Sequence, residues 1–215
     1  MSDQVIFSVY KLIVLLFSVV LHEVSHGFLA KLQGDNTAEV AGRLTLNPLP
    51  HLDPFGSIIL PFLLAIPTFF GAPSVIIGWA KPVPFNPANL KNKKWGPAWV
   101  ALAGPLTNIL LAVIFGIIIR FSYLIPTSPP SFGIFLSVIV LINLLLAIFN
   151  LMPIPPLDGS KLLFAVLPVS WRNFEFQLER YGFFLILLFV FFGFDLILPL
   201  IFRLFGIITG QPFSF

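Results

Sequence analysis

Two histidines and a glutamate lie close together near the end of the first apolar run, in the stretch LHEVSHGFLA at 21–30. On a helix, His22 and His26 share one face about one turn apart, because their spacing is i, i+4. Their imidazoles can therefore bind one metal ion. Glu23 lies on the adjacent strip of the helix, where a carboxylate can act as a base. This combination suits hydrolysis by a metal-activated water.

A catalytic zinc ion needs a third protein ligand and keeps one position open. The chain has no cysteine, three histidines and nine acidic residues, so few candidates exist. Asp158 is the best of them, because it follows a proline-rich turn in NLMPIPPLDGSK at the end of an apolar segment. His51 and Asp53 are alternatives, and we favour a structural turn for both. The simpler interpretations are a histidine pair bonded to carbonyls and an ordinary turn at PLDG.

The composition indicates an integral membrane protein: 58% of the residues are hydrophobic, 10% are charged, and the mean hydropathy is +1.00. Soluble domains carry roughly 25% charged residues. We expect an all-α polytopic bundle of about five transmembrane segments, forming a single domain over 1–215. The segments are expected at about 5–32, 54–80, 97–123, 132–152 and 181–208, with a polar linker carrying Glu175 and Glu179 before the last. The net charge of +3 is spread over segment ends and does not indicate nucleic-acid binding.

The segment at 54–80 is unusual because prolines and glycines interrupt it. We expect a re-entrant hairpin or a broken segment there, since such backbone must be covered at membrane depth. Lysines and arginines place 31–53, 81–96 and 153–180 on the cytoplasmic side. A hairpin makes no net crossing, so the first and fourth segments run in the same direction. That topology brings His26 and Asp158 to the same end of the bundle.

Three stretches in this order, HEVSHG, AGPLTN (103–108) and NLMPIPPLDG (150–159), resemble the site-2 protease family of intramembrane zinc metalloproteases. GRLTLNPLPHLDPFG (42–56) and GWAKPVPFNP (78–87) are similar to a compact prokaryotic branch without a PDZ domain. The resemblance covers about 22–159. It implies one catalytic Zn²⁺ held by His22, His26 and Asp158.

The resemblance also implies that Glu23 activates the attacking water and that Asn150 orients substrate or stabilises an oxyanion. Asn108 would pack near the core helices or make an interhelical hydrogen bond. The implied reaction is hydrolysis of peptide bonds within or near transmembrane segments of membrane proteins. The implied location is a prokaryotic cell membrane, with the active site toward the cytoplasm.

The partners implied are a transmembrane protein substrate, the lipid bilayer, and a regulatory partner or a second copy of the chain. The proline-rich stretch at 82–87 could bind an extended peptide as an added strand. Two other functions compete with proteolysis: a membrane metal-ion transporter and an inactive membrane scaffold. A transporter would not need Glu23 between the two histidines.

Overall fold

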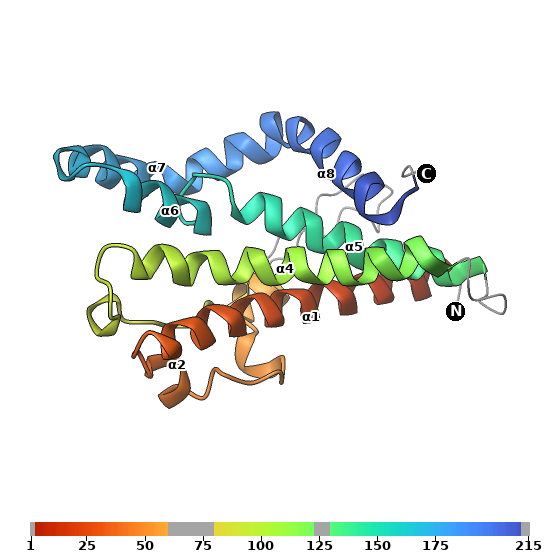
Figure 1. Cartoon of the computed structure of the whole chain (residues 1–215), viewed down its shortest axis with the longest axis horizontal. Helices are drawn as coiled ribbons and strands as arrows, with labels where there is room; N and C mark the ends of the chain where they lie inside the picture. The colour runs from red at the N-terminus through yellow and green to blue at the C-terminus, as the bar shows by residue number, and fades with distance from the viewer. Residues whose placement is uncertain (1–2, 60–79, 123–129, 212–215) are drawn as a thin grey trace.

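The computed structural model describes residues 3–59, 80–122 and 130–211, and the described residues are helical with no strand (Figure 1). The long helices are α1 (Asp3–Leu32), α4 (Gly96–Phe121), α5 (Pro130–Asn150), α7 (Arg172–Leu188) and α8 (Phe194–Thr209). The short ones are α2 (Thr37–Val40), η1 (Leu49–His51), η2 (Pro54–Ile59), η3 (Pro87–Asn89), α6 (Asp158–Val166), η5 (Val169–Trp171) and η6 (Phe189–Gly193).

Four helical stretches are long and apolar enough to cross a membrane: Val5–Leu32, Gly96–Phe121, Ser131–Asn150 and Arg172–Thr209. They confirm the all-α polytopic expectation and correspond to the first, third, fourth and fifth expected segments. The expected hairpin or broken segment at 54–80 lies, beyond Ile59, outside the described residues.

The last span begins earlier than expected, because α7 starts at Arg172 rather than near 181. The stretch expected as a polar, amphipathic linker is therefore helical, and Glu175 and Glu179 lie on the first turns of α7. Its charged residues do not break the helix because they lie at its surface, and Glu179 Oε1 lies 3.4 Å from Lys161 Nζ. At 1.5 Å per residue, the 38-residue run has a path of about 57 Å, and Figure 1 shows that it bends between α7 and α8.

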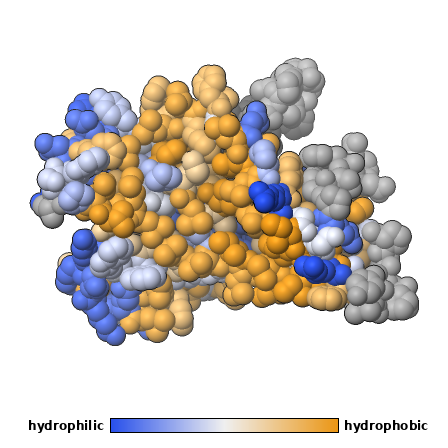
Figure 2. Space-filling view, turned by 45° about the horizontal axis from the view of Figure 1, so that its top comes forward, coloured by the Kyte–Doolittle hydropathy of each residue, from blue (hydrophilic) through white to orange (hydrophobic). Residues whose placement is uncertain are grey.

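Helices α1 and α5 run in the same direction, and α4 runs antiparallel beside them (Figure 1). The end of α1, the start of α4, α6 and the start of α7 consequently meet at one end of the molecule. Figure 2 shows hydrophilic residues gathered at that end, next to a broad apolar surface. The shared direction of α1 and α5 is the one that the charge pattern predicted.

Close helix packing stabilises the bundle away from the polar end. A buried cluster joins α4, α5 and α8 and comprises Ala112, Ile119, Leu136, Val140, Leu144, Ile197, Ile201 and Phe205. Gly116 on α4 permits this contact, because a Cβ there would lie 2.3 Å from Ile208 Cγ2. Small residues are common at such interfaces, since packing rather than the hydrophobic effect holds helices together in lipid.

Arg120, near the end of α4, also has a structural role. Its Nη1 donates to the carbonyl of Ile207 at 3.2 Å, in the last turn of α8. Carbonyls in the last turn lack intrahelical partners, and a cation is favourable there. The arginine therefore caps the last helix.

Replacing Gly116 with Leu should destabilise the bundle by about 1–3 kcal/mol, because the side chain overpacks the contact between α4 and α8. The thermal unfolding midpoint in detergent measures the effect. Gly133→Leu is the matched control, because a Cβ at Gly133 meets no atom within 4 Å. Equal midpoints for the two variants would show that this contact is not tight.

Candidate metal centre

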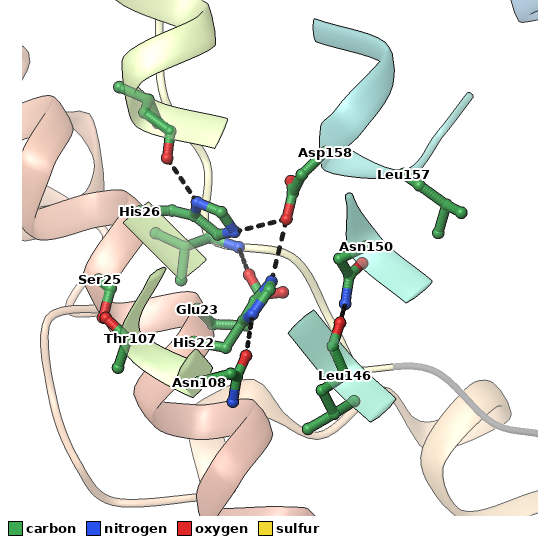
Figure 3. Close-up of polar contacts among 12 residues, drawn as sticks. His22, Glu23, Ser25, His26, Thr107, Asn108, Leu146, Asn150, Leu157 and Asp158 are labelled. Atoms are coloured by element: carbon green, nitrogen blue, oxygen red, sulfur yellow. Dashed lines mark hydrogen bonds and ion pairs between the residues drawn. The ribbon is translucent and has the colours of Figure 1, made fainter. Parts of the chain in front are cut away.

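His22 and His26 on α1 lie against Asp158, the first residue of α6 (Figure 3). The Oδ2 atom of Asp158 lies 3.1 Å from Nε2 of His22 and 3.3 Å from Nε2 of His26. One ligand atom from each residue lies within 4.8 Å of the others. Both histidines are buried, whereas the Asp158 side chain is 21% exposed. The structure thus brings together the three residues that the sequence nominated as ligands.

The partners of the imidazoles indicate where their protons lie. His22 Nδ1 lies 2.6 Å from Asn108 Oδ1, and His26 Nδ1 lies 2.7 Å from the Val100 carbonyl. Both partners are acceptors, so each Nδ1 carries a proton, and in the neutral imidazole each Nε2 directs a lone pair at Asp158. These lone pairs and the carboxylate repel one another unless a cation or extra protons lie between them. Tetrahedral zinc, with bonds of about 2.0–2.1 Å, separates ligand atoms by about 3.3 Å, so the donor set fits zinc.

A buried polar network fixes the orientation of His22. The Asn108 amide nitrogen donates to Asn143 Oδ1 at 2.8 Å and to the Ser18 carbonyl at 3.3 Å, so its oxygen faces His22. Asn143 Nδ2 donates in turn to Ser18 Oγ at 3.0 Å. Asn108 therefore makes the expected interhelical hydrogen bonds and also holds an imidazole. Sequence reasoning missed Asn143, although a lone amide in the middle of an apolar span was a signal.

Two glycines allow backbone to approach the cluster closely. A Cβ at Gly104 on α4 would lie 2.5 Å from His26 Nε2 and 2.6 Å from His22 Nε2. A Cβ at Gly159 would lie 2.2 Å from the Leu151 carbonyl oxygen, where the start of α6 packs on the end of α5. Gly159 is helical, and a lack of space requires glycine there.

Glu23 lies beside the histidines, and a backbone amide holds its carboxylate (Figure 3). Its Oε2 accepts a hydrogen bond of 2.8 Å from the N–H of Val83. Val83 is buried and belongs to the segment 80–86, which has no regular secondary structure. The neighbouring residues Pro82 and Pro84 have no N–H, so Val83 supplies the only amide donor of these three residues.

Asp35, which is fully buried just after α1, anchors the same segment. Its Oδ2 accepts from the Asn86 N–H at 2.6 Å, and its Oδ1 accepts from Asn89 Nδ2 at 2.9 Å. The Thr37 side chain and backbone also donate to Asp35. Burial favours the neutral acid, but these hydrogen bonds outweigh it and lower the pKa of Asp35 below its ordinary value. Asp35 is therefore a carboxylate that holds the segment carrying Val83 against α1.

The other nominated residues lie outside the cluster. Asn150, at the end of α5, uses its amide nitrogen to bond the Leu146 carbonyl of its own helix at 2.9 Å (Figure 3). His51 Nε2 bonds the Thr45 carbonyl at 3.0 Å, and Asp53 Oδ1 accepts from the Gly56 N–H at 2.6 Å. These are local contacts of the kind found in turns.

Comparison with known proteins identifies the family. The sequence profile of peptidase family M50 matches residues 10–128 and 128–193. A protein of Bacillus subtilis named "Putative zinc metalloprotease YwhC" is 37% identical over 179 residues, which cover 81% of this chain and 76% of that protein. "Putative zinc metalloprotease Rip2" of Mycolicibacterium smegmatis is 35% identical over 147 residues, covering 67% of this chain and 52% of that protein.

A third relative is "Putative zinc metalloprotease MJ0611" of Methanocaldococcus jannaschii, which is 45% identical over 65 residues, 30% of this chain and 31% of that protein. No solved structure gives a significant match. The family expected from the sequence motifs is confirmed. The chain belongs to peptidase family M50, the site-2 protease family, and is a membrane zinc metalloprotease.

Proposed function

We propose that this protein hydrolyses peptide bonds within or near transmembrane segments of membrane proteins. His22, His26 and Asp158 would hold the zinc ion, and Glu23 would be the general base. The observation that carries the proposal is the approach of both Nε2 atoms to one Asp158 oxygen, at 3.1 and 3.3 Å, among apolar helices. A site in that position is reached more readily by a membrane-embedded peptide than by a folded soluble protein.

The protein supplies the base and its orientation. When bound, zinc activates water and polarises the scissile carbonyl. Glu23 takes the proton of the attacking water and passes it to the leaving amine. The Val83 N–H fixes one of its carboxylate oxygens at 2.8 Å and so limits rotation of the base. The same contact occupies the Val83 donor, so a peptide added as a strand to 82–87 would need other backbone groups.

Asn150 is proposed to orient the substrate or to stabilise the oxyanion. It lies at the end of α5, and Figure 3 places it on the side of the cluster near Asp158. Its amide nitrogen bonds only one carbonyl among the described residues, and an amide group has a second hydrogen to donate.

We further propose that the metal centre faces the cytoplasm of a prokaryotic cell. Most of the basic residues lie at the end of α1, between α1 and α4, on α6 or in the first turns of α7, namely Lys31, Arg43, Lys81, Lys91, Lys93, Lys94, Lys161, Arg172 and Arg180. An excess of Lys and Arg marks the cytoplasmic side of membrane proteins. The chain would act as a single domain over 1–215, with access controlled by a regulatory partner or a second copy.

Replacing Glu23 with Gln should retain zinc but lower the rate of cleavage by about 10²–10⁴, because the amide cannot accept the proton. The measurement pairs zinc content with cleavage of a tagged single-span membrane protein in proteoliposomes. The control is Glu39→Gln, at an exposed glutamate that pairs with Lys31. Cleavage by the Glu23 variant at the wild-type rate would refute the role of this residue.

Replacing Gly104 with Ala should reduce the zinc bound per chain about tenfold or more, because its Cβ would displace both imidazoles. Elemental analysis after dialysis measures the metal. Gly133→Ala adds the same methyl group to a helix where it meets nothing, and should keep a full equivalent. If the Gly104 variant folds and retains all its zinc, these histidines do not hold the ion.

Replacing Asn150 with Ala should leave zinc content unchanged and lower kcat about 10²–10³-fold, as the loss of an oxyanion donor does elsewhere. Ser137→Ala on the same helix is the control, because Ser137 Oγ also bonds a carbonyl four residues earlier. Equal kcat values for these two variants would assign Asn150 to helix structure alone.

A further inference from the structure

A cavity of about 490 Å³ lies at the polar end of the molecule, and α6, which begins at Asp158, forms part of its wall. It is formed by the segment before α4, the start of α4, α6 and α7. Apolar side chains of Phe85, Pro97 and Phe164 line it together with the basic side chains of Lys93, Lys94 and Lys161. Glu175 is the one acidic residue in its lining. The cavity therefore combines an apolar wall with an excess of positive charge.

The elements that form this cavity are those that position the catalytic groups. Asp158 and Lys161 are one turn apart on α6, about 4.5 Å along the axis. Pro97 lies one turn before Val100, whose carbonyl contacts His26. Phe85 lies two residues after Val83, about 7 Å along an extended chain. Three walls of the cavity thus lie about 4.5–7 Å along the backbone from residues that form or contact the metal centre.

The basic groups of the cavity are available for a ligand. Lys161 pairs with Glu179 at 3.4 Å, and both side chains are partly exposed, so the pair is weak and exchangeable. Lys93 donates to the Ala88 carbonyl, which leaves further donors on its ammonium group. The Lys161 ammonium lies 5.7 Å from the Phe164 ring. A carboxylate on an apolar stem would match these neighbours.

We propose that this cavity is a substrate subsite that selects an acidic residue two or three positions from the scissile bond. An extended chain rises about 3.3 Å per residue, so two or three residues of substrate match these backbone offsets. The proposal rests on the proposed peptide hydrolysis. A peptide is the favoured occupant because the cavity is formed by the elements that hold Glu23, His26 and Asp158.

Peptide binding tests the subsite independently of catalysis. The zinc-loaded Glu23→Gln protein, in phosphatidylcholine nanodiscs, is titrated with three fluorescent peptides of one apolar sequence. Within one set, the peptides differ only at one position, which is Glu, Gln or Lys. Further sets place this residue at successive positions of the sequence. At one position the Glu peptide should bind about fivefold to tenfold more tightly than the Gln peptide, and the difference should shrink as salt is added.

Charge reversal at the cavity supplies the decisive comparison. Adding Lys93→Glu and Lys161→Glu should reverse the preference, so that the Lys peptide binds best. Lys91→Glu is the matched control, because Lys91 belongs to the same loop but contacts the Leu32 carbonyl and is not among the cavity residues. It should keep the preference for Glu. Thermal midpoints within a few degrees of one another show that all variants are folded.

Equal binding of the three peptides, or an unchanged preference after charge reversal, overturns the subsite. A second outcome also overturns the subsite. If peptide binding does not depend on charge, and the parent protein retains phosphatidylserine whereas the charge-reversed variant does not, the cavity is a lipid headgroup site. If the peptides bind in a charge-dependent way but the wild-type protein, with Glu23 intact, does not cleave the tagged membrane protein, the subsite stands and the proposed hydrolysis is refuted.

Discussion

The site is organised by one interaction. The Nε2 atoms of His22 and His26 and a carboxylate oxygen of Asp158 point toward one another. The Nδ1 atoms of His22 and His26 face carbonyl oxygens, so in the neutral imidazoles the Nε2 atoms have no proton to share with Asp158. Such a group is unstable in an apolar bundle unless a cation or extra protons lie within it. In this account, zinc binding and the packing of α6 against α1 are one event, and the metal stabilises the fold around it.

The surrounding bundle serves this contact in two ways. Glycines allow close contacts at two positions. Gly104 lets α4 approach the imidazoles of His22 and His26, and Gly159 lets the start of α6 approach the carbonyl of Leu151. Amides and backbone groups then fix orientation: Asn108 aligns His22, and the Val83 N–H aligns Glu23. Asp35 holds the segment 80–86 in place through the Asn86 N–H, and this segment contributes Phe85 to the cavity. Catalytic geometry and substrate selection would therefore share one support.

Much of this arrangement was predictable, because membrane helices leave strong signals. Apolar length gave the spans, and the i, i+4 spacing with the charge distribution predicted that His26 and Asp158 would meet. The early start of α7 was not predicted, because exposed charges on a helix resemble those of a linker. The contacts of Gly104, Asn143 and Val83 could not be predicted, since they depend on which faces of α1, α4 and α5 pack together. The hydrogen bond from Asn150 to the Leu146 carbonyl of its own helix could not be predicted either, because residue spacing does not reveal it.

X-ray absorption at the zinc edge, on the purified protein and on Asp158→Ala, reports directly on the ligands of the metal. If His22, His26 and Asp158 hold the ion, the protein should contain one zinc ion per chain, with scattering from two imidazole rings and an added oxygen contribution. The variant should lose part of that oxygen contribution or lose the ion. A zinc environment that is identical in the two proteins, or that contains no imidazole, would contradict the account.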